Sequence, residues 1–356
     1  MTLEEVVRSI TPADQNAAAQ AKARWDSIAK PLGSLGALES AIIRIAAITG
    51  SPNVDISKRA VVVMCADNGV VADGVTQTGQ EVTAIVAENM STGDTSVCAM
   101  GRAAGVEIVP VDIGVATPLH GAKILQKNIR RGTANLSQGP AMTWEEAERA
   151  ILVGVEVARG LCTQGIRLLG TGEMGIGNTT TSSAVASVFL NRPPVDMTGR
   201  GAGLSSEGLR RKIHAIEQGI AVNRPDPNDP LDVLHKVGGL DLAGLAGVFL
   251  GGAMCHVPVL VDGFISSVAA LIAARICPDS RDYMLGSHAS DEPASKLVLA
   301  DLGLEPFLYA GMRLGGGTGA VAVMPLLAIS RYTARPMSSR GITATAPVPS
   351  PSRIPA

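Results

Sequence analysis

The feature that most constrains the fold is a continuous apolar segment, Ala60–Cys65, which contains three consecutive valines and no polar residue. A strand with one face in water alternates polar and apolar residues, whereas a strand packed on both faces does not. Strands of the second kind belong to parallel sheets that helices cover on both sides. This segment therefore predicts a strand of such a sheet.

The rest of the chain alternates between short apolar runs and segments with helical spacing. Further strands are expected at 106–113, 166–169, 257–261 and 283–287, and Pro110 weakens the first of them because proline cannot donate to a ladder. Apolar residues at helical spacing predict the intervening helices. The expected helices are 38–48, 83–90, 145–160, 179–190, 207–222, 241–253 and 266–275. The alternation predicts an α/β protein with a parallel sheet covered on both faces.

The two ends of the chain differ from this central part. Residues 1–28 are expected to be helical, with one helix starting at Thr11 or Pro12, and to pack as a small helical unit beside the sheet. The last residues are rich in Ser, Thr and Pro and are expected to be flexible. The expected divisions are a small helical domain over 1–50 with part of 325–340, a large domain over 55–325, and a flexible tail over 336–356.

Charge and aromatic content exclude some partners. The formal net charge is −2, which gives no long-range attraction to nucleic acid or to an anionic membrane. Two Trp, three Tyr and four Phe are too few for the stacking platforms that bind single strands. We therefore expect no nucleic-acid and no membrane partner. With 46% hydrophobic but 3% aromatic residues, small aliphatic side chains must fill the core.

The cysteines and the apolar stretch 242–261 bear on the compartment. The five cysteines are scattered, with no C-x-x-C pair, which argues against a disulfide framework or a zinc site and fits a reducing cytosol. The stretch 242–261 is broken by His256 and Pro258 and runs into Asp262, so a buried helix followed by a strand explains it better than a membrane span. The N-terminus lacks a signal-peptide pattern, and the protein is expected to be cytoplasmic, with no bound metal.

Polar and glycine-rich loops follow the predicted strands, where ligands of parallel sheets bind. They are 66–70, 170–180, 287–292 and 313–319. The 170–180 loop contains four glycines and leads into Asn178, Thr179 and Thr180, which could cap the next helix. A helix N-terminus with free N–H groups binds phosphate, although the glycines could instead serve only a tight turn. The loop matches neither G-x-x-x-x-G-K-[ST] nor G-x-G-x-x-G, so ATP and NAD are not expected.

Several charged residues accompany these loops. Glu173 is unexpected beside an anion site, because a carboxylate there needs a cationic partner. Lys212 could reach a phosphate from its helix, or could lie on a solvated face. His288 could be a general base, or a structural histidine. Asp262 ends an apolar strand, so we expect it to face a site or to pair with another group.

Taken in order, the motifs resemble those of the nicotinate-nucleotide:dimethylbenzimidazole phosphoribosyltransferase family. The motifs are KPLGSLGALE, ADNGV, GQEVT, GTANLSQGPAMT, GEMGIGNTT, TGRGAGL, VPVLVDGFI, SHASDE and MRLGGGTGA, which span residues 30–320. GEMGIGNTT and VPVLVDGFI are the most specific of them. The resemblance implies a Rossmann-like large domain, a small helical domain and a homodimer.

The resemblance also implies a reaction and a site. Ribose 5-phosphate passes from nicotinate mononucleotide, a substrate rather than a cofactor, to the lower-ligand base of a cobamide. Glu173 matches the loop glutamate of the family, and its carboxylate would stabilise the cationic, oxocarbenium-like transition state. The implied substrate-binding residues are Gly175, Ile176, Gly177, Asn178, Thr179, Thr180, Gly201, Lys212, Asp262, Ser290, Gly315, Gly316, Gly317, Thr76 and Gln80. No cofactor is expected.

The chain departs from the family on the side of the incoming base. The family's late loop reads R-L-G-E-G-T-G-A, with the glutamate as general base, and here Gly316 takes that position. The segment 76–79 also lacks the family's usual base-pocket residues. Loss of a general base costs about 10²–10⁴-fold in rate. A replacement base could come from Glu173, Glu81 or a partner subunit.

These departures leave three interpretations open. The first is a phenolic acceptor, because two-subunit relatives of the family transfer phosphoribose to phenol or p-cresol, and this chain is similar to one subunit of such a pair. The second is a catalytically weak ligand-binding or scaffolding subunit that supports an active paralogue. The third is a dimethylbenzimidazole enzyme with a relocated base. The assembly is expected to be a homodimer or a heterodimer with a paralogous subunit.

Overall fold

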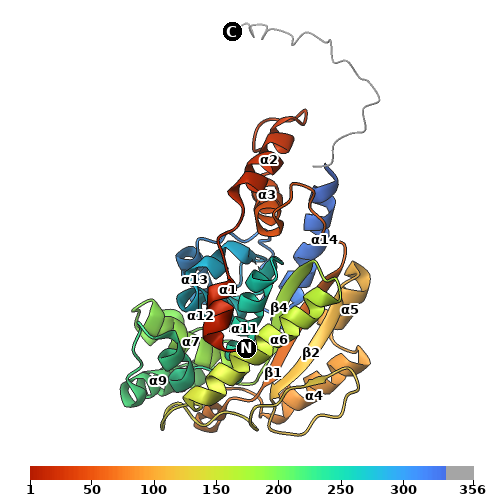
Figure 1. Ribbon diagram of the computed structural model, residues 1–356. Helices are drawn as coiled ribbons and strands as arrows, with labels where there is room; N and C mark the ends of the chain where they lie inside the picture. The colour runs from red at the N-terminus through yellow and green to blue at the C-terminus, as the bar shows by residue number, and fades with distance from the viewer. Residues whose placement is uncertain (334–356) are drawn as a thin grey trace, which may run out of the picture.

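A parallel sheet forms the centre of the molecule, as expected from the sequence. The computed structural model describes residues 1–333. In that range six parallel strands lie in the order β3-β2-β1-β4-β5-β6. Three of them, β2, β1 and β4, are labelled in Figure 1. Their bounds are β1 Arg59–Ala66, β2 Glu107–Gly114, β3 Leu125–Gln126, β4 Leu168–Met174, β5 Val259–Val261 and β6 Met284–Gly286. The short strand β3 had no clear sequence signal, because two residues are too few to show a period.

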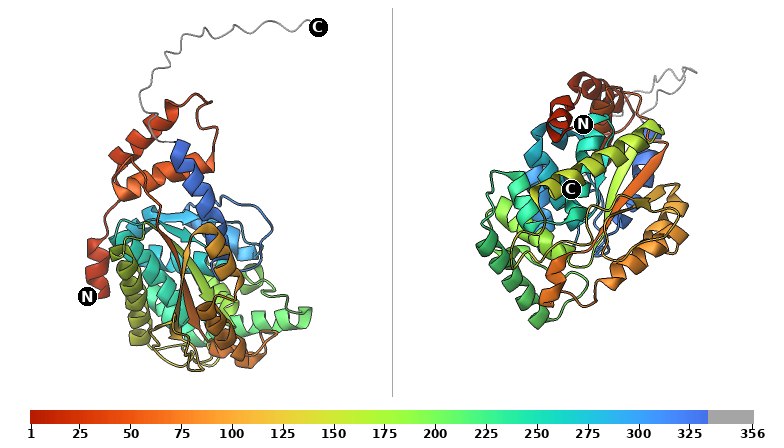
Figure 2. Two further views of the ribbon diagram at one scale, coloured as in Figure 1. Left: turned by 90° about the vertical axis from the view of Figure 1, so that its right-hand side faces the viewer. Right: turned by 60° about the horizontal axis from the view of Figure 1, so that its bottom comes forward.

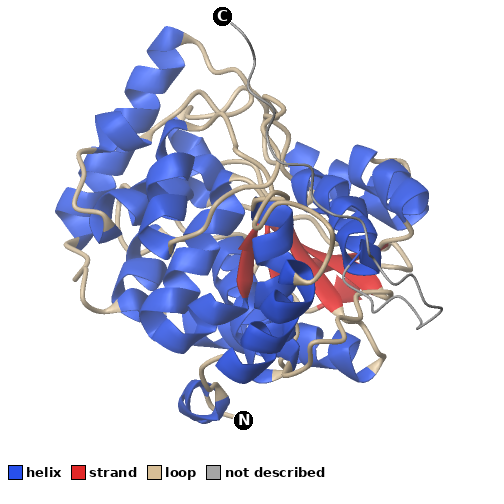
Figure 3. Ribbon diagram, turned by 90° about the horizontal axis from the view of Figure 1, so that it is seen from above, coloured by secondary structure: helices blue, strands red, loops and turns tan. Residues whose placement is uncertain are grey.

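Helices cover both faces of the sheet (Figure 3). Ala60, Val62 and Met64 of β1 belong to the core on one face, and Val61 and Val63 belong to the core on the other. The first face is covered by α6 Trp144–Thr163, α7 Asn178–Phe189, α9 Ser206–Asn223, α10 Pro230–Val237, α11 Leu240–Met254, α12 Phe264–Ile276 and α13 Pro293–Leu302. The second is covered by α4 Glu81–Thr92, α5 Ser96–Ala104 and α14 Thr318–Thr333. The remaining short helices are α8 Pro194–Met197, η1 Gly69–Asp73 and η2 Pro278–Tyr283.

A small helical projection stands apart from the rest of the molecule, beside the C-terminal helix of the described chain (Figure 1). Helices α2 Gln15–Asp26 and α3 Ala37–Thr49 stand above the sheet, and α14 packs against α3 (Figures 1 and 2). Helix α1 Leu3–Ser9 instead packs on α6 and α11, where Leu3 and Val6 enter the main core. Residues 1–50 therefore do not form one helical unit, because the apolar face of α1 is buried in the large body.

The start of α2 and the apolar stretch 242–261 were both predicted from the sequence. Helix α2 starts after Asp14, whose carboxylate accepts the Asn16 and Ala17 N–H groups, rather than at Thr11 or Pro12. The apolar stretch 242–261 forms α11 and then β5, as expected. Within residues 1–333, the helices lack the combination of length and hydropathy needed to cross a membrane. The expected tail, 336–356, lies outside the described residues.

Helices α6 and α11 approach each other closely through glycines, and this contact supports a stability prediction. A Cβ at Gly154 would lie 1.9 Å from the Gly244 carbonyl oxygen, whereas a Cβ at Gly160 of the same helix meets nothing within 4 Å. Gly154→Ala is therefore expected to lower the free energy of unfolding by about 1–3 kcal/mol. The matched control, Gly160→Ala, should raise it by about 0.5–1 kcal/mol. Urea denaturation measures both, and equal stabilities of the two variants would contradict the close contact.

Candidate active site

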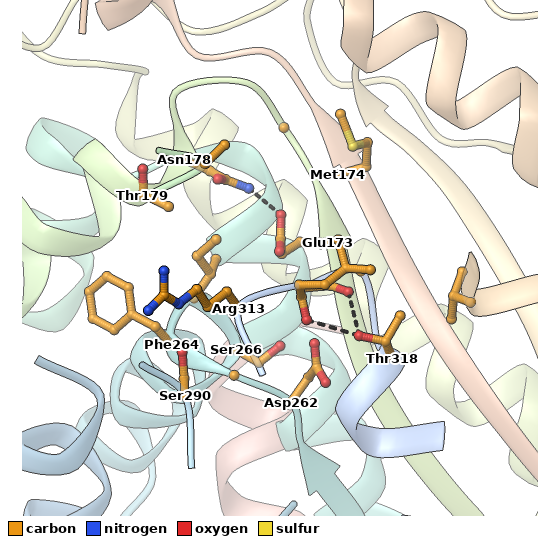
Figure 4. A pocket seen from close by; sticks show the side chains of 18 of the residues that line it. Glu173, Met174, Asn178, Thr179, Asp262, Phe264, Ser266, Ser290, Arg313 and Thr318 are labelled. Carbon is orange, nitrogen blue, oxygen red and sulfur yellow. Dashed lines mark hydrogen bonds between the residues drawn. The ribbon is translucent and has the colours of Figure 1, made fainter. Parts of the chain in front are cut away.

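A cavity of about 260 Å³ lies at the carboxyl ends of β4, β5 and β6. It is bounded by the end of β4, the start of α12, the segment after β6 and the loop that leads into α14 (Figure 4). A second cavity of about 280 Å³ adjoins it and shares Gly175, Ile176, Asn178, Thr179 and Gly201. Ligands of parallel sheets bind at this edge, so the position agrees with the expectation from the sequence.

Glu173 is the penultimate residue of β4 and directs its carboxyl group into the first cavity (Figure 4). The Asn178 side-chain amide donates to its Oε2 atom. Burial raises the pKa of Glu173 to about 8, and the nearby Asp241 and Asp262 carboxylates add to this effect. A carboxyl group with a pKa near neutrality can exchange a proton during a reaction.

The start of α7 is arranged differently from the capped helix that the sequence predicted. Gly177 is the N-cap, with φ +96°, and no side chain caps the helix. Asn178 binds Glu173 instead, and Thr179 binds Lys212. Thr180 is fully buried, its hydroxyl has no hydrogen-bond partner, and it lines neither cavity. The difference has a physical reason, since the Asn178 and Thr180 N–H groups donate to the carbonyl oxygens of Gly175 and Gly177 and therefore need no side-chain cap.

Lys212 brings a buried positive charge to the second cavity. Its side chain is 1% exposed, and its Nζ donates to Thr179 Oγ1 at 2.8 Å and to the Gly199 carbonyl oxygen at 3.1 Å. Burial lowers the pKa of Lys212 to about 8. Gly201 lies beside it with φ +53° and donates its N–H to Glu292 Oε1. The solvated-face interpretation of Lys212 is therefore wrong, because α9 turns this residue toward the core.

Asp262 lines the first cavity and also fixes the late glycine-rich loop. Its two carboxylate oxygens accept the N–H groups of Gly317 and Ala320, each at 3.0 Å. His288 Nδ1 lies 3.9 Å from Asp262 Oδ1. Asp262 thus pairs with backbone and histidine while it faces the cavity, which agrees with the expectation for a charge at the end of an apolar strand.

The late loop brings Gly315 and Gly316 to the cavity. A Cβ at Gly315 would lie 2.4 Å from Glu173 Oε1, so the loop backbone packs against the carboxyl group. Gly316 has φ +71°, and its open side faces the cavity. Gly317 does not line the cavity, because it packs against Val61 of β1.

Some of the remaining predicted residues line a cavity, and one of them supports a neighbouring loop instead. Ser290 lines the first cavity and Thr76 lines the second. Gln80 lines neither of them, since its Nε2 donates to the Asn68 carbonyl oxygen at 3.1 Å and supports the loop after β1. Gly177 lines the second cavity only.

Sequence reasoning missed an apolar wall and two acidic residues. Val86 and Met90 of α4 line the first cavity together with Met174, Phe264 and Leu314, a surface suited to a flat aromatic ring. No local motif marks these residues, because ordinary core residues look the same. Glu292 lines the cavity beside Gly201, and Asp241 is buried behind it. Asp241 had a usable signal, since it is an acidic residue in an otherwise apolar helix.

The site is thus a carboxylate and an ammonium group held by consecutive residues at the start of one helix, next to an apolar wall. In residues 1–333 no group of three or more potential metal ligands is found. The arrangement can hold an anion near Lys212, stabilise a cation near Glu173 and enclose an aromatic ring.

Comparison with known proteins identifies the family. A family model described as phosphoribosyltransferase matches residues 10–342. The nicotinate-nucleotide–dimethylbenzimidazole phosphoribosyltransferase of Acetivibrio thermocellus is 50% identical over 311 residues, which is 87% of this chain and 89% of the relative. That of Clostridium acetobutylicum is 44% identical over 333 residues, or 94% and 95% of the two chains. The crystal structure of CobT from Thermus thermophilus superposes with a TM-score of 0.86 at 42% identity, covering 90% of this chain and 96% of that one. The chain belongs to this phosphoribosyltransferase family and is a pentosyltransferase.

Proposed function

We propose that this protein transfers the 5-phosphoribosyl group of nicotinate mononucleotide to an aromatic lower-ligand base in cobamide assembly. The products are nicotinate and an α-riboside phosphate. The observation that carries the proposal is that the consecutive residues Asn178 and Thr179 bind a buried carboxyl group and a buried ammonium group, respectively. The donor has a phosphate, which an ammonium group can bind, and its ribose develops a positive charge in the transition state, which a carboxylate can stabilise.

The donor is expected to bind across the two cavities. Its phosphate would contact Lys212 and Gly201, which line the second cavity, and the start of α7, where the helix dipole favours an anion. Its anomeric carbon would then lie near Glu173. When the bond from this carbon to the pyridinium nitrogen breaks, the electron pair remains on nicotinate, and the carboxylate stabilises the positive charge left on the ribose.

The acceptor is expected to lie against the apolar wall of the first cavity. The names of two similar relatives support dimethylbenzimidazole in this role. The attacking nitrogen forms a bond to the anomeric carbon, and the N–H proton must pass to a base. Glu173 is our candidate for this base, because it lines the cavity and has a pKa near the working pH. No cofactor is required.

A phenolic acceptor is the second candidate, and Gly316 favours it. A glycine at this position cannot accept a proton from a benzimidazole, and Thr76 lies in the adjoining cavity rather than on the apolar wall. A phenol, with an unperturbed pKa near 10, also loses its proton when its oxygen attacks. Glu173 would serve this acceptor in the same way.

The test uses the purified full chain with nicotinate mononucleotide and either dimethylbenzimidazole, phenol or p-cresol. Chromatography with mass detection measures nicotinate release and riboside phosphate formation. We expect product with at least one acceptor, and the ratio of kcat/KM values identifies the preferred one. Product from the isolated chain would exclude a pure scaffold. No riboside phosphate with any of the three, even in a single turnover, would overturn the proposal.

Lys212→Met should weaken donor binding with little effect on the acceptor. Methionine has a similar length and fits the buried site without the charge. A hydrogen bond to a charged group contributes about 1.5–3 kcal/mol, so KM for nicotinate mononucleotide is expected to rise about 10- to 100-fold. Steady-state kinetics with each substrate varied measures this. An unchanged donor KM would place the phosphate elsewhere.

We also propose that the active assembly is a dimer, either of this chain or with a paralogous subunit. The loop between α2 and α3 exposes Leu32 (74%) and Leu35 (41%), two large apolar side chains at the end of the small helical projection. Such side chains at an exposed loop favour a protein contact. Sedimentation velocity of the full chain separates a monomer from a dimer, and Leu32→Ser should weaken a dimer formed through this loop.

A further inference from the structure

Asp241 is a buried acidic residue that the mechanism above does not use. It lies in the first turn of α11, is 0% exposed, and accepts the Leu242 N–H at 3.0 Å through Oδ1. Its Oδ2 atom has no hydrogen-bond partner. A buried carboxylate without a cationic partner destabilises the fold, so a role in function would explain why an acidic residue lies here.

The position of Asp241 links it to the catalytic carboxyl group. The Asn178 side-chain amide donates to Glu173, and Asn178 also lies close to Asp241, whose pKa it lowers. A Cβ at Gly175 would lie 2.8 Å from Asp241 Oδ2 and 3.3 Å from Asn178 Nδ2, so these atoms meet behind the loop. Asp241 does not line the first cavity, and it therefore acts only through its neighbours.

We propose that Asp241 is a positioning residue that, through Asn178, orients the Glu173 carboxyl group and keeps it basic enough to accept the proton of the acceptor. The inference rests on the proposed function. The proton leaves the acceptor N–H or O–H for the Glu173 carboxylate while the acceptor bonds to the anomeric carbon. The pyridinium nitrogen leaves with the electron pair of its bond to that carbon.

The charges around the pair support this role. Asp241 and Asp262 both raise the pKa of Glu173, and Asp67 raises that of Asp241. Cys65 of β1 is also close to Glu173 and Asp241, and its own thiol has a raised pKa, so it adds no charge at neutral pH. Among the basic side chains near this group, His288 lies beside Asp262, and Arg313, which also lines the cavity, is paired with Asp291. With its pKa at about 6, Asp241 is ionised at neutral pH and disfavours the ionised form of Glu173.

The experiment compares pH profiles of kcat/KM for the wild type, Asp241→Asn and Asn178→Ala. Asp241→Asn removes the charge and keeps the shape, so the limb that reports Glu173 should move to lower pH by about one unit. Asn178→Ala removes a hydrogen bond that lowers the pKa of Glu173, so the same limb should move to higher pH. Both variants should lower kcat at the optimum, and Asp241→Asn, at a residue that lines neither cavity, should leave the KM for nicotinate mononucleotide unchanged. A merely structural role would not move the two limbs in opposite directions.

The outcomes separate the inference from the proposed function. Turnover by the wild type with coincident profiles of wild type and Asp241→Asn would overturn the inference and leave the function standing. Absence of riboside phosphate from the wild type would overturn the function. Carboxyl ¹³C NMR of protein with labelled glutamate, with Glu173→Gln to identify the signal, follows the same titration without turnover. An unshifted Glu173 titration in Asp241→Asn would also refute the inference, and Asn178→Ala supplies the opposite shift if Asp241→Asn does not fold.

Discussion

Replacing Glu173 by glutamine is expected to lower kcat by about 10²–10⁴-fold while nicotinate mononucleotide still binds. Glutamine keeps the size and the hydrogen bond to Asn178, but it has no negative charge for the ribose cation and cannot accept a proton. Steady-state kinetics gives kcat, and isothermal titration gives the donor affinity. A variant with more than a tenth of wild-type kcat would remove Glu173 from the chemistry.

The same substitution has a pH-dependent effect on stability that checks the ionisation of Glu173. Its pKa is raised in the folded protein to about 8, above the ordinary value of 4.5. The folded state therefore holds the proton more tightly, and wild-type stability falls as pH rises from about 4.5 to about 8. Glu173→Gln lacks this loss, so its stability relative to wild type should increase over that window. Urea denaturation at pH 5 and pH 8 measures the free energy of unfolding of both proteins. Lys212→Met, which changes another buried charged residue, is the comparison variant.

Introducing glutamate at position 316 is expected to increase turnover with dimethylbenzimidazole by about 10²-fold, the lower end of a general-base contribution. The position faces the cavity, and the nearest atom to an added Cβ is the Glu173 carbonyl oxygen at 3.7 Å, so the side chain has room. Two carboxyl groups would then share the site, and one of the apparent pKa values should rise. The measurement is the ratio of dimethylbenzimidazole activity to phenol activity, which should increase if the missing glutamate at position 316 sets the acceptor preference.

Gly316→Gln is the matched control for this gain. Both variants place a side chain at φ +71°, which costs about 1–2 kcal/mol for a residue other than glycine. The two should therefore lose similar stability in urea denaturation. If Gly316→Gln gained as much dimethylbenzimidazole activity as Gly316→Glu, the missing base would not explain the acceptor preference.

Much of the fold could be predicted because the signals are local. The three valines of β1 show that both faces are buried, and the two cores on either side of that strand confirm it. Helix α11 and strand β5 were expected from the broken apolar stretch 242–261, and both form there. Strand β3 was not predicted, because a two-residue strand shows no period. Helix α1 lies within the region that was expected to be helical, but its packing on α6 and α11 was not predicted, because the sequence of a short helix does not indicate its packing partner.

Part of the candidate site could also be predicted from the sequence, and part could not. Glu173, Lys212 and Asp262 were expected in it from their motifs, and the structure places each beside one of the two cavities. Thr180 and Gly317 have the same motif context as their neighbours, yet one is buried in α7 and the other packs on β1. Helical and loop geometry turns consecutive residues in different directions, so membership of a motif does not by itself bring a side chain to a ligand.

By itself, the sequence determined the parallel sheet, the loops at its carboxyl edge and the replacement of a glutamate by Gly316. Only the tertiary structure decided that Asn178 binds Glu173 close to Asp241, that Thr179 holds Lys212, and that the glycine-rich loops differ in role. The physical reason is that strand burial and turn formation depend on neighbouring residues. The ionisation of a buried carboxyl group depends instead on charges brought together from β4, α7 and α11 by packing.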